Sequence, residues 1–187
     1  MPAPKPEVGL RAWTDDDLPL LRGLLADPRM MTYLGGPESE EKLLERHARY
    51  LAIDGGGTGR VFAVIAGPEH AAAGWVGYWQ TKWRGEPAWE TGWSVLPEFQ
   101  GRGLATRGAA LAMEVLADEG RYRFVYAFPA VDNAPSNAVC ARLGMEMVGT
   151  ESLEYPPGTW MDCAIWRREL PRQGPAAGVR IAMADES

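Results

Sequence analysis

A strand, a glycine-rich turn and a helix follow one another between residues 87 and 118, and this unit constrains the fold more than any other part of the sequence. Pro87 to Leu96 is typical of a buried strand that ends at Pro97, and Arg102 to Asp118 of an amphipathic helix. A short strand is predicted next, at residues 124–128. Strands linked through a helix pair in parallel, with a right-handed crossover. The sequence therefore predicts at least one parallel strand pair.

The rest of the chain supplies consecutive strands and further helices. Strands are predicted at residues 8–13, 60–66, 74–83, 145–155 and 159–168, and helices at about 16–27, 38–53 and 133–143. Consecutive strands joined by short turns pair antiparallel. We therefore expect a mixed α/β sheet, mostly antiparallel, with helices on both faces. Residues 1–170 are expected to form one domain, and residues 171–187, rich in Pro, Gly and Ala, a C-terminal tail.

Charge and composition argue against several classes of protein. The net charge of −6 argues against a general nucleic-acid binder, which needs a basic surface to replace counterions, and mildly favours a cationic partner. No apolar run approaches the roughly 20 residues that span a bilayer, and the N-terminus lacks the apolar core of a secretory signal. We expect a cytoplasmic protein without a membrane partner.

Cysteine and histidine are too few and too scattered to predict a metal site. Cys140 and Cys163 are the only cysteines, His47 and His70 are the only histidines, and no short ligand spacing joins them. We therefore expect no bound metal, and thiols that stay reduced. His47 falls in the stripe of a predicted helix and is expected to be packed or half-exposed. His70 falls in a turn and is expected at the surface.

The turn between Gln100 and Thr106 has the properties of an anion site. Gly101 and Gly103 allow the backbone to approach a bulky anion, and the following helix presents unpaired N–H groups at the positive end of its dipole. A diphosphate is a natural ligand for such a turn. A dinucleotide-binding fold fits poorly because Thr106 stands where its third glycine belongs, and the Gly-Lys-Ser/Thr of a P-loop is missing. A turn that only starts a helix stays as another interpretation.

This turn resembles the acyl-CoA diphosphate signature of the GNAT N-acetyltransferase superfamily. The matching residues are Gln100-x-x-Gly103-x-Ala105, behind Val95-x-Pro97. The resemblance implies a GNAT fold and acetyl-CoA as the co-substrate.

Two further segments resemble one branch of that superfamily, the RimJ/RimL type that acetylates the N-termini of ribosomal proteins. One is Trp89 to Trp93, an acidic entry into the same strand, and the other is Asn133 to Met145, a helix and turn after the next strand. The resemblance covers about residues 8–168. Two positions depart from the pattern: Cys140 stands where many members carry a tyrosine general acid, and Met145 replaces an aromatic residue.

The resemblance assigns roles to residues of the strand, the turn and the later helix. The backbone of Ser94, Val95 and Leu96 is expected to pair with the pantetheine arm as an added strand does. The expected diphosphate contacts are the N–H groups of Gly101, Arg102, Gly103, Ala105 and Thr106, with Gln100 as the side-chain member of the motif. Asn133 is expected to reach the pantetheine and Ser136 to face the thioester sulfur.

Glu90 is the candidate general base, because it precedes the cofactor strand and could take the amine proton directly or through water. Each catalytic or binding assignment here has a plain structural alternative. Glu90 could be a solvated carboxylate at a strand edge, Ser136 could hydrogen-bond within the first helical turn, and Asn133 could only cap its helix. Cys140 is a poor candidate for an acyl-carrying nucleophile, because no histidine is near it in the sequence.

The pKa of the acceptor amine favours an α-amino group. Attack on a thioester needs the neutral amine, and an α-amino group has a pKa of about 7.7–8.0, whereas lysine has about 10.4. A chain with few strong base candidates therefore fits an α-amine or another low-pKa amine better than a lysine. The resemblance implies transfer of an acetyl group to a protein or peptide N-terminus, and we expect a monomer or a homodimer. A small amine such as a polyamine, amino acid or aminoglycoside is the nearest alternative acceptor. A catalytically silent acyl-CoA sensor and an interaction protein are the alternatives from other classes.

Tryptophans are concentrated on the two strands before the turn. Trp75, Trp79 and Trp83 are spaced evenly on one strand, and Trp89 and Trp93 on the next, so each set is expected to share a sheet face. Core packing explains most of them, and any that line the acceptor cleft would suit an apolar or cationic substrate.

Overall fold

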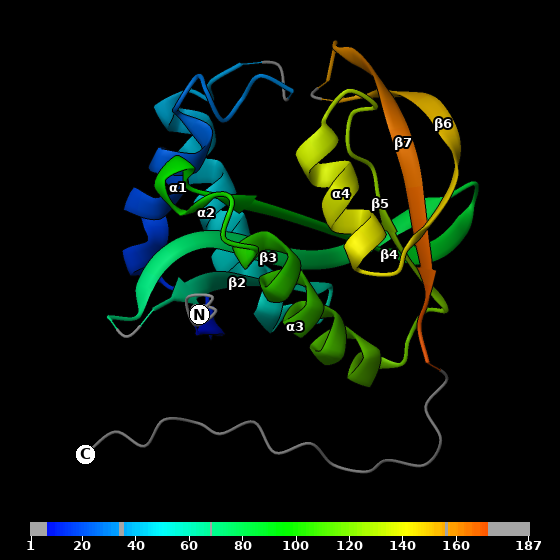
Figure 1. Ribbon diagram of the computed structural model, residues 1–187, viewed down its shortest axis with the longest axis horizontal. Coiled ribbons are helices and arrows are strands. Elements are labelled where there is room, and N and C mark those ends of the chain that lie inside the picture. The colour runs from blue at the N-terminus through cyan, green and yellow to red at the C-terminus, as the bar shows by residue number, and fades with distance from the viewer. Residues whose placement is uncertain (1–6, 34–35, 68, 156, 172–187) are drawn as a thin grey trace, which may run out of the picture.

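A computed structural model describes residues 7–33, 36–67, 69–155 and 157–171, which form a seven-stranded sheet flanked by helices (Figure 1). The strands are β1 (Val8–Ala12), β2 (Gly59–Ala66), β3 (Ala71–Trp83), β4 (Glu86–Val95), β5 (Phe124–Ala127), β6 (Glu146–Glu154) and β7 (Trp160–Glu169). The helices are α1 (Leu18–Leu25), α2 (Glu40–Gly55), α3 (Leu104–Glu119) and α4 (Ala134–Arg142), with 3-10 turns η1 (Asp15–Asp17) and η2 (Pro97–Phe99). The strand order is β1-β2-β3-β4-β5-β7-β6.

The predicted fold class is confirmed. Every strand pair is antiparallel except β4 with β5, which is parallel and joined through α3. The main difference concerns where α3 begins. It starts at Leu104 rather than near Arg102, because Gly101 and Gly103 both hold φ +74°, a left-handed conformation that does not continue a helix. Apart from Pro171, the predicted tail lies outside the described residues.

Helices cover both faces of the sheet, and each face has its own core. Leu104, Ala112 and Leu116 of α3 pack with Val76 and Trp89 on one face. On the other face, Leu24 of α1 and Leu43 of α2 pack with Trp13 and with Trp75 of β3. The register of β3 with β4 places Trp75, Trp79 and Trp83 on the α1–α2 face and Trp89 and Trp93 on the α3 face. The prediction that each set of tryptophans shares a face is confirmed.

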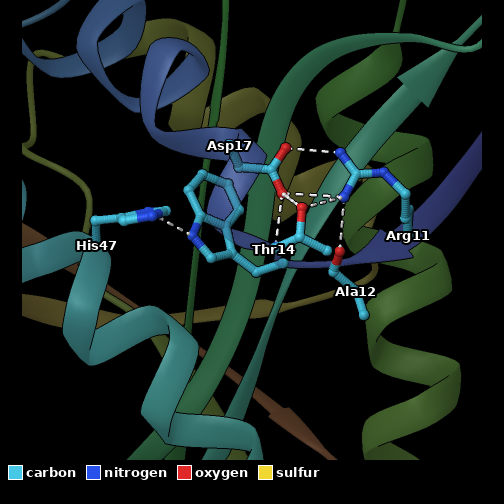
Figure 2. A network of polar contacts seen from close by, with 6 residues as sticks. Arg11, Ala12, Thr14, Asp17 and His47 are labelled. Atoms are coloured by element: carbon cyan, nitrogen blue, oxygen red, sulfur yellow. Dashed lines mark hydrogen bonds and ion pairs between the residues drawn. The ribbon is translucent and has the colours of Figure 1, made fainter.

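A polar corner fixes the chain between β1 and α1 (Figure 2). The carboxylate of Asp17 accepts from both terminal nitrogens of Arg11, at 3.0 and 2.6 Å, and from the N–H of Thr14 at 2.8 Å. Beside it, the indole N–H of Trp13 donates to Nδ1 of His47 at 3.1 Å. These bonds hold the start of α1 and the middle of α2 against the sheet. Of the two placements expected for His47, packed or half-exposed, the structure shows the packed one, since the side chain is buried.

The strands β4 and β5 pair over a short distance only. Their Cα register comprises Trp89 with Val125 and Glu90 with Tyr126, although β4 continues to Val95. On this side, the segment of β4 from Thr91 to Val95 therefore has no strand partner within the described residues. This open edge leads directly into the glycine turn.

Candidate active site

The turn after β4 presents a row of unpaired backbone donors. In the described part of the chain, the N–H groups of residues 101–106 donate no hydrogen bond, whereas the N–H of Gln100 donates to Pro97 O at 3.2 Å. No atom lies within 4 Å of the position that a Cβ would take at Gly101, and at Gly103 only Arg107 Nε comes as near as 4.0 Å. The turn is therefore open above both glycines, with its donors at the N-terminus of a 16-residue helix. This geometry fits a diphosphate.

Two arginines hold the shape of the turn through its carbonyl groups. Arg102 Nη2 donates to Glu98 O at 2.9 Å, and Arg107 Nη2 donates to Arg102 O at 2.9 Å. Each bond turns a carbonyl toward a guanidinium group, which leaves the opposite side of the turn to the N–H groups. The two cations also make the potential at the turn more positive, which favours an anion.

The open edge of β4 presents different residues from those predicted. The N–H of Leu96 donates to Ala73 O at 2.8 Å, and its carbonyl accepts from the N–H of Phe99 at 2.9 Å, so Leu96 has no free backbone group. Hydrogen-bonded pairs alternate along an antiparallel ladder, so the backbone of Ser94 also faces β3. The prediction that the backbone of Leu96 and Ser94 pairs with pantetheine is therefore corrected. The backbone of Val95 faces the open edge, and so does the backbone of Trp93, which sequence reasoning missed.

The side chain of Gln100 is directed back to the end of β4. Its Nε2 donates to Val95 O at 3.0 Å and lies 3.3 Å from Sδ of Met30, in the connection between α1 and α2. Gln100 thus joins the turn, the strand and the α1–α2 connection, which is a structural role in addition to its place in the motif.

The start of α4 carries the two remaining predicted residues. Asn133 caps α4, because its Oδ1 accepts from the N–H of Ser136 at 3.2 Å. This bond leaves the amide NH₂ of Asn133 and the half-buried hydroxyl of Ser136 without a partner in the described part of the protein. Cys140 is fully buried, and burial raises the pKa of its thiol to about 12, so it is a packed core residue rather than a nucleophile.

Glu90 is a half-buried carboxylate at the point where β4 and β5 separate. It faces Trp79 across the β3–β4 pair and Tyr126 across the β4–β5 pair. Burial raises its pKa above the usual value, and hydrogen-bond donation from Trp79 and Thr81 offsets part of that rise. A raised pKa makes this carboxylate a stronger base, which suits the acceptance of a proton from an amine.

The α1–α2 face beside Glu90 is lined by aromatic rings. Trp75 packs against Trp79 with ring centroids 6.4 Å apart, and Trp83 packs against Phe128 at 5.0 Å. Tyr126 stacks on Phe128 at 5.9 Å. We call these five residues the aromatic wall. The even spacing of Trp75, Trp79 and Trp83 on β3 indicated a shared face from the sequence. The position of the aromatic wall beside Glu90 depends on the pairing of β3, β4 and β5.

Neither a candidate metal cluster nor a membrane-spanning helix occurs among the described residues. No group of three or more His, Cys, Asp or Glu side chains there could hold a metal ion. Among the described helices, none combines the length and the apolar character of a membrane span.

Comparison with known proteins agrees with this geometry. Residues 7–146 match the family described as "Acetyltransferase (GNAT) domain". Similar solved structures include RimL, the ribosomal L7/L12 α-N-protein acetyltransferase, in complex with coenzyme A; it has 21% identity and a TM-score of 0.72, and the match covers 87% of this chain and 94% of that one. A Salmonella typhimurium acetyltransferase that modifies the N-terminal serine of L7/L12 has 20% identity, coverage of 88% and 95%, and a TM-score of 0.72.

A third structure belongs to an enzyme with a different acceptor. Spermidine N-acetyltransferase from Vibrio cholerae, in complex with coenzyme A and spermine, has 20% identity, covers 88% of this chain and 96% of its own, and has a TM-score of 0.72. At these identities the structures share the fold, while the family match spans well over half of the chain. The protein therefore belongs to the GNAT acetyltransferase family and is an acetyl-CoA-dependent N-acyltransferase.

Proposed function

We propose that this enzyme acetylates the N-terminal α-amino group of a peptide or protein. The observation that carries the proposal is that Glu90 stands without a basic partner beside the aromatic wall. Among the described residues Glu90 forms no ion pair, whereas two other carboxylates do. Glu151 pairs with Arg84 at 3.6 Å, and Glu38 pairs with Arg46.

One carboxylate among aromatic rings suits one amine attached to an apolar group. The ring faces attract a cation, and Glu90 supplies the single negative charge that receives its proton. A polyamine carries several positive charges, and each further charge needs its own carboxylate or water contact. A peptide N-terminus presents one charge and a side chain that the rings can contact.

The amine pKa supports the same acceptor. At pH 7 an α-amino group with a pKa of about 7.7–8.0 is already partly neutral. The pKa of a lysine, about 10.4, lies roughly two to three units higher, so its neutral form is much rarer. At 1.36 kcal/mol per unit the difference is on the order of 3–4 kcal/mol. A single half-buried carboxylate is therefore a sufficient base for the α-amine.

The residues of the site then have distinct roles. Acetyl-CoA supplies the activated thioester, and the N–H groups of residues 101–106 hold its diphosphate. The backbone of Trp93 and Val95 aligns the pantetheine, and the amide of Asn133 contacts it. Glu90 accepts the amine proton, directly or through water, and the hydroxyl of Ser136 donates to the departing sulfur. Thiolates with a pKa near 8.5 leave readily, so positioning supplies most of the acceleration.

A small-amine acceptor is the second candidate, supported by the fold shared with a spermidine acetyltransferase. Release of the coenzyme A thiol, measured with peptides that differ in their first residue and with spermidine, separates the two. We expect at least a ten-fold higher kcat/KM for the peptides, and highest for an apolar or aromatic first residue. Faster release with spermidine would contradict the proposal. Coenzyme A binding without any acceptor-dependent release would favour a silent acyl-CoA module instead.

We also place the enzyme in the cytoplasm. Both cysteines are free and buried, which is compatible with a reducing compartment.

A further inference from the structure

We propose that Trp79 is a positioning residue that orients the Glu90 carboxylate and closes one side of the reaction centre. The inference rests on the proposed function of Glu90 as the base. Trp79 and Glu90 are Cα partners across the β3–β4 pair, so both side chains project from the same face of the sheet. The indole has one donor, its Nε1–H, and the cross-strand register places this ring beside the carboxylate on one face of the sheet.

The same indole also covers the backbone next to Glu90. A Cβ atom at Gly92 would lie 3.0 Å from Cη2 of Trp79 and 3.5 Å from Cη2 of Trp75. The benzene ring of Trp79 therefore rests on Gly92, where the edge of β4 is already open. Trp79 spans from Glu90 to Gly92 and forms one side of the space through which an amine reaches the thioester.

Packing from α2 restrains the indole in this orientation. Trp79 packs on Trp75 at 6.4 Å, and Trp75 packs on Tyr50 of α2 at 5.5 Å. Tyr50 in turn is contacted by Arg46 Nη1 at 3.5 Å. A ring held on its other side by this series of contacts has few rotamers available, so its N–H keeps one direction.

Groups from three other strand positions also face Glu90. These are Thr81 on β3, Tyr126 on β5 and Cys163 on β7. The pKa of the Cys163 thiol is raised, mainly by burial and further by the charges of Asp162 and Glu90. Arg167 of β7 is directed to Glu146 at 3.1 Å. In the described part of the protein no cation contacts Glu90, so the donors on β3 provide its main stabilisation in the ionised form that a base requires.

The test is the titration of Glu90 in the Trp79→Phe variant, which keeps a ring and removes the donor. The carboxyl ¹³C signal of Glu90, assigned by its loss in Glu90→Gln, reports the pKa without need of an acceptor. We expect the pKa to rise by about 0.5–1 unit in Trp79→Phe. The matched control, Trp160→Phe, alters a tryptophan that is 68% exposed at the start of β7 and should leave the titration unchanged.

The pH profile of turnover gives the second measurement. In Trp79→Phe, kcat at pH 7 should fall several-fold while KM for acetyl-CoA stays within two-fold, and activity should recover as the pH is raised. Gly92→Ala, which places a methyl group against the same ring, should also raise the pKa of Glu90. An unchanged pKa in both variants overturns the inference. Absence of acceptor-dependent turnover in the wild type, with the pKa shift present, overturns the proposed function alone.

Discussion

The side-chain amide of Gln100 donates to the main-chain oxygen of Val95 at 3.0 Å and so ties the glycine turn to the last residue of β4. This bond spans the junction between the two surfaces that we assign to coenzyme A: the open strand edge and the row of free N–H groups. Because a hydrogen bond within the protein fixes this junction, ligand binding has less backbone to order there.

Loss of the hydrogen bond between Gln100 and Val95 should weaken coenzyme A binding. Gln100→Met keeps the length of the side chain and loses the donor, and we expect the Kd for coenzyme A to rise about 5- to 10-fold, the equivalent of one hydrogen bond. Titration calorimetry measures the change. A Kd within two-fold of the wild type would show that the turn keeps its shape without Gln100.

Substitutions at Gly103 separate backbone strain from loss of the anion site. Gly103→Glu places bulk and negative charge beside the free N–H groups and should abolish coenzyme A binding. Gly158, on the β6–β7 connection, also has a positive φ, of +86°, and open space around it. Gly158→Ala and Gly103→Ala should therefore each lower the free energy of unfolding by about 1 kcal/mol. Gly158→Ala should leave the Kd for coenzyme A unchanged. Tight binding by Gly103→Glu would refute the assignment of the turn.

Glu90→Gln should reduce turnover far more than coenzyme A affinity, and it should also stabilise the protein. The folded-state pKa of Glu90 is raised, so ionisation costs stability as the pH rises through that pKa, and an amide avoids the cost. We expect kcat to fall at least 100-fold and the Tm at pH 8 to rise by about 2–4 °C. The Tm gain should disappear below pH 4. A wild-type rate in this variant would remove Glu90 as the base.

The corner around Asp17 has the opposite pH dependence. Burial raises the pKa of Asp17, but hydrogen bonds from Arg11 and Thr14 outweigh it, so the pKa lies below its usual value. The stabilisation is therefore present above about pH 4 and is lost as the pH falls through the lowered pKa. Asp17→Asn should reduce the free energy of unfolding by about 1–2 kcal/mol at pH 7 and by less at pH 3. Urea unfolding measures this, with exposed Asp15→Asn as the control; equal losses at both pH values would contradict the account.

Much of the fold could be predicted from local patterns. The change from helical to alternating spacing near Gly59 and the strand–turn–helix unit at Pro97 gave the element order and the parallel pair, since each depends on neighbouring residues. The start of α3 was less accurate because the conformations of Gly101 and Gly103 are not encoded in hydrophobic spacing.

The sequence indicated the strand and the turn of the candidate site, but not the register of that strand. Which backbone groups of β4 face the open edge depends on its pairing with β3. A register shift of one residue would direct the backbone of Leu96, rather than that of Val95, to this edge. The proximity of Trp79 to Glu90 likewise arises from two strands that meet only in the folded sheet. Sequence spacing placed Trp79 on a face without indicating which carboxylate shares it.

The most direct test of the central claim is a coenzyme A titration of ¹⁵N-labelled protein, followed through its backbone amide signals. If the turn binds the diphosphate, the amides of residues 101–106 will show the largest shifts and will saturate together with the amides of Trp93 and Val95. Saturable binding that moves other amides and leaves those of residues 101–106 unchanged would contradict it.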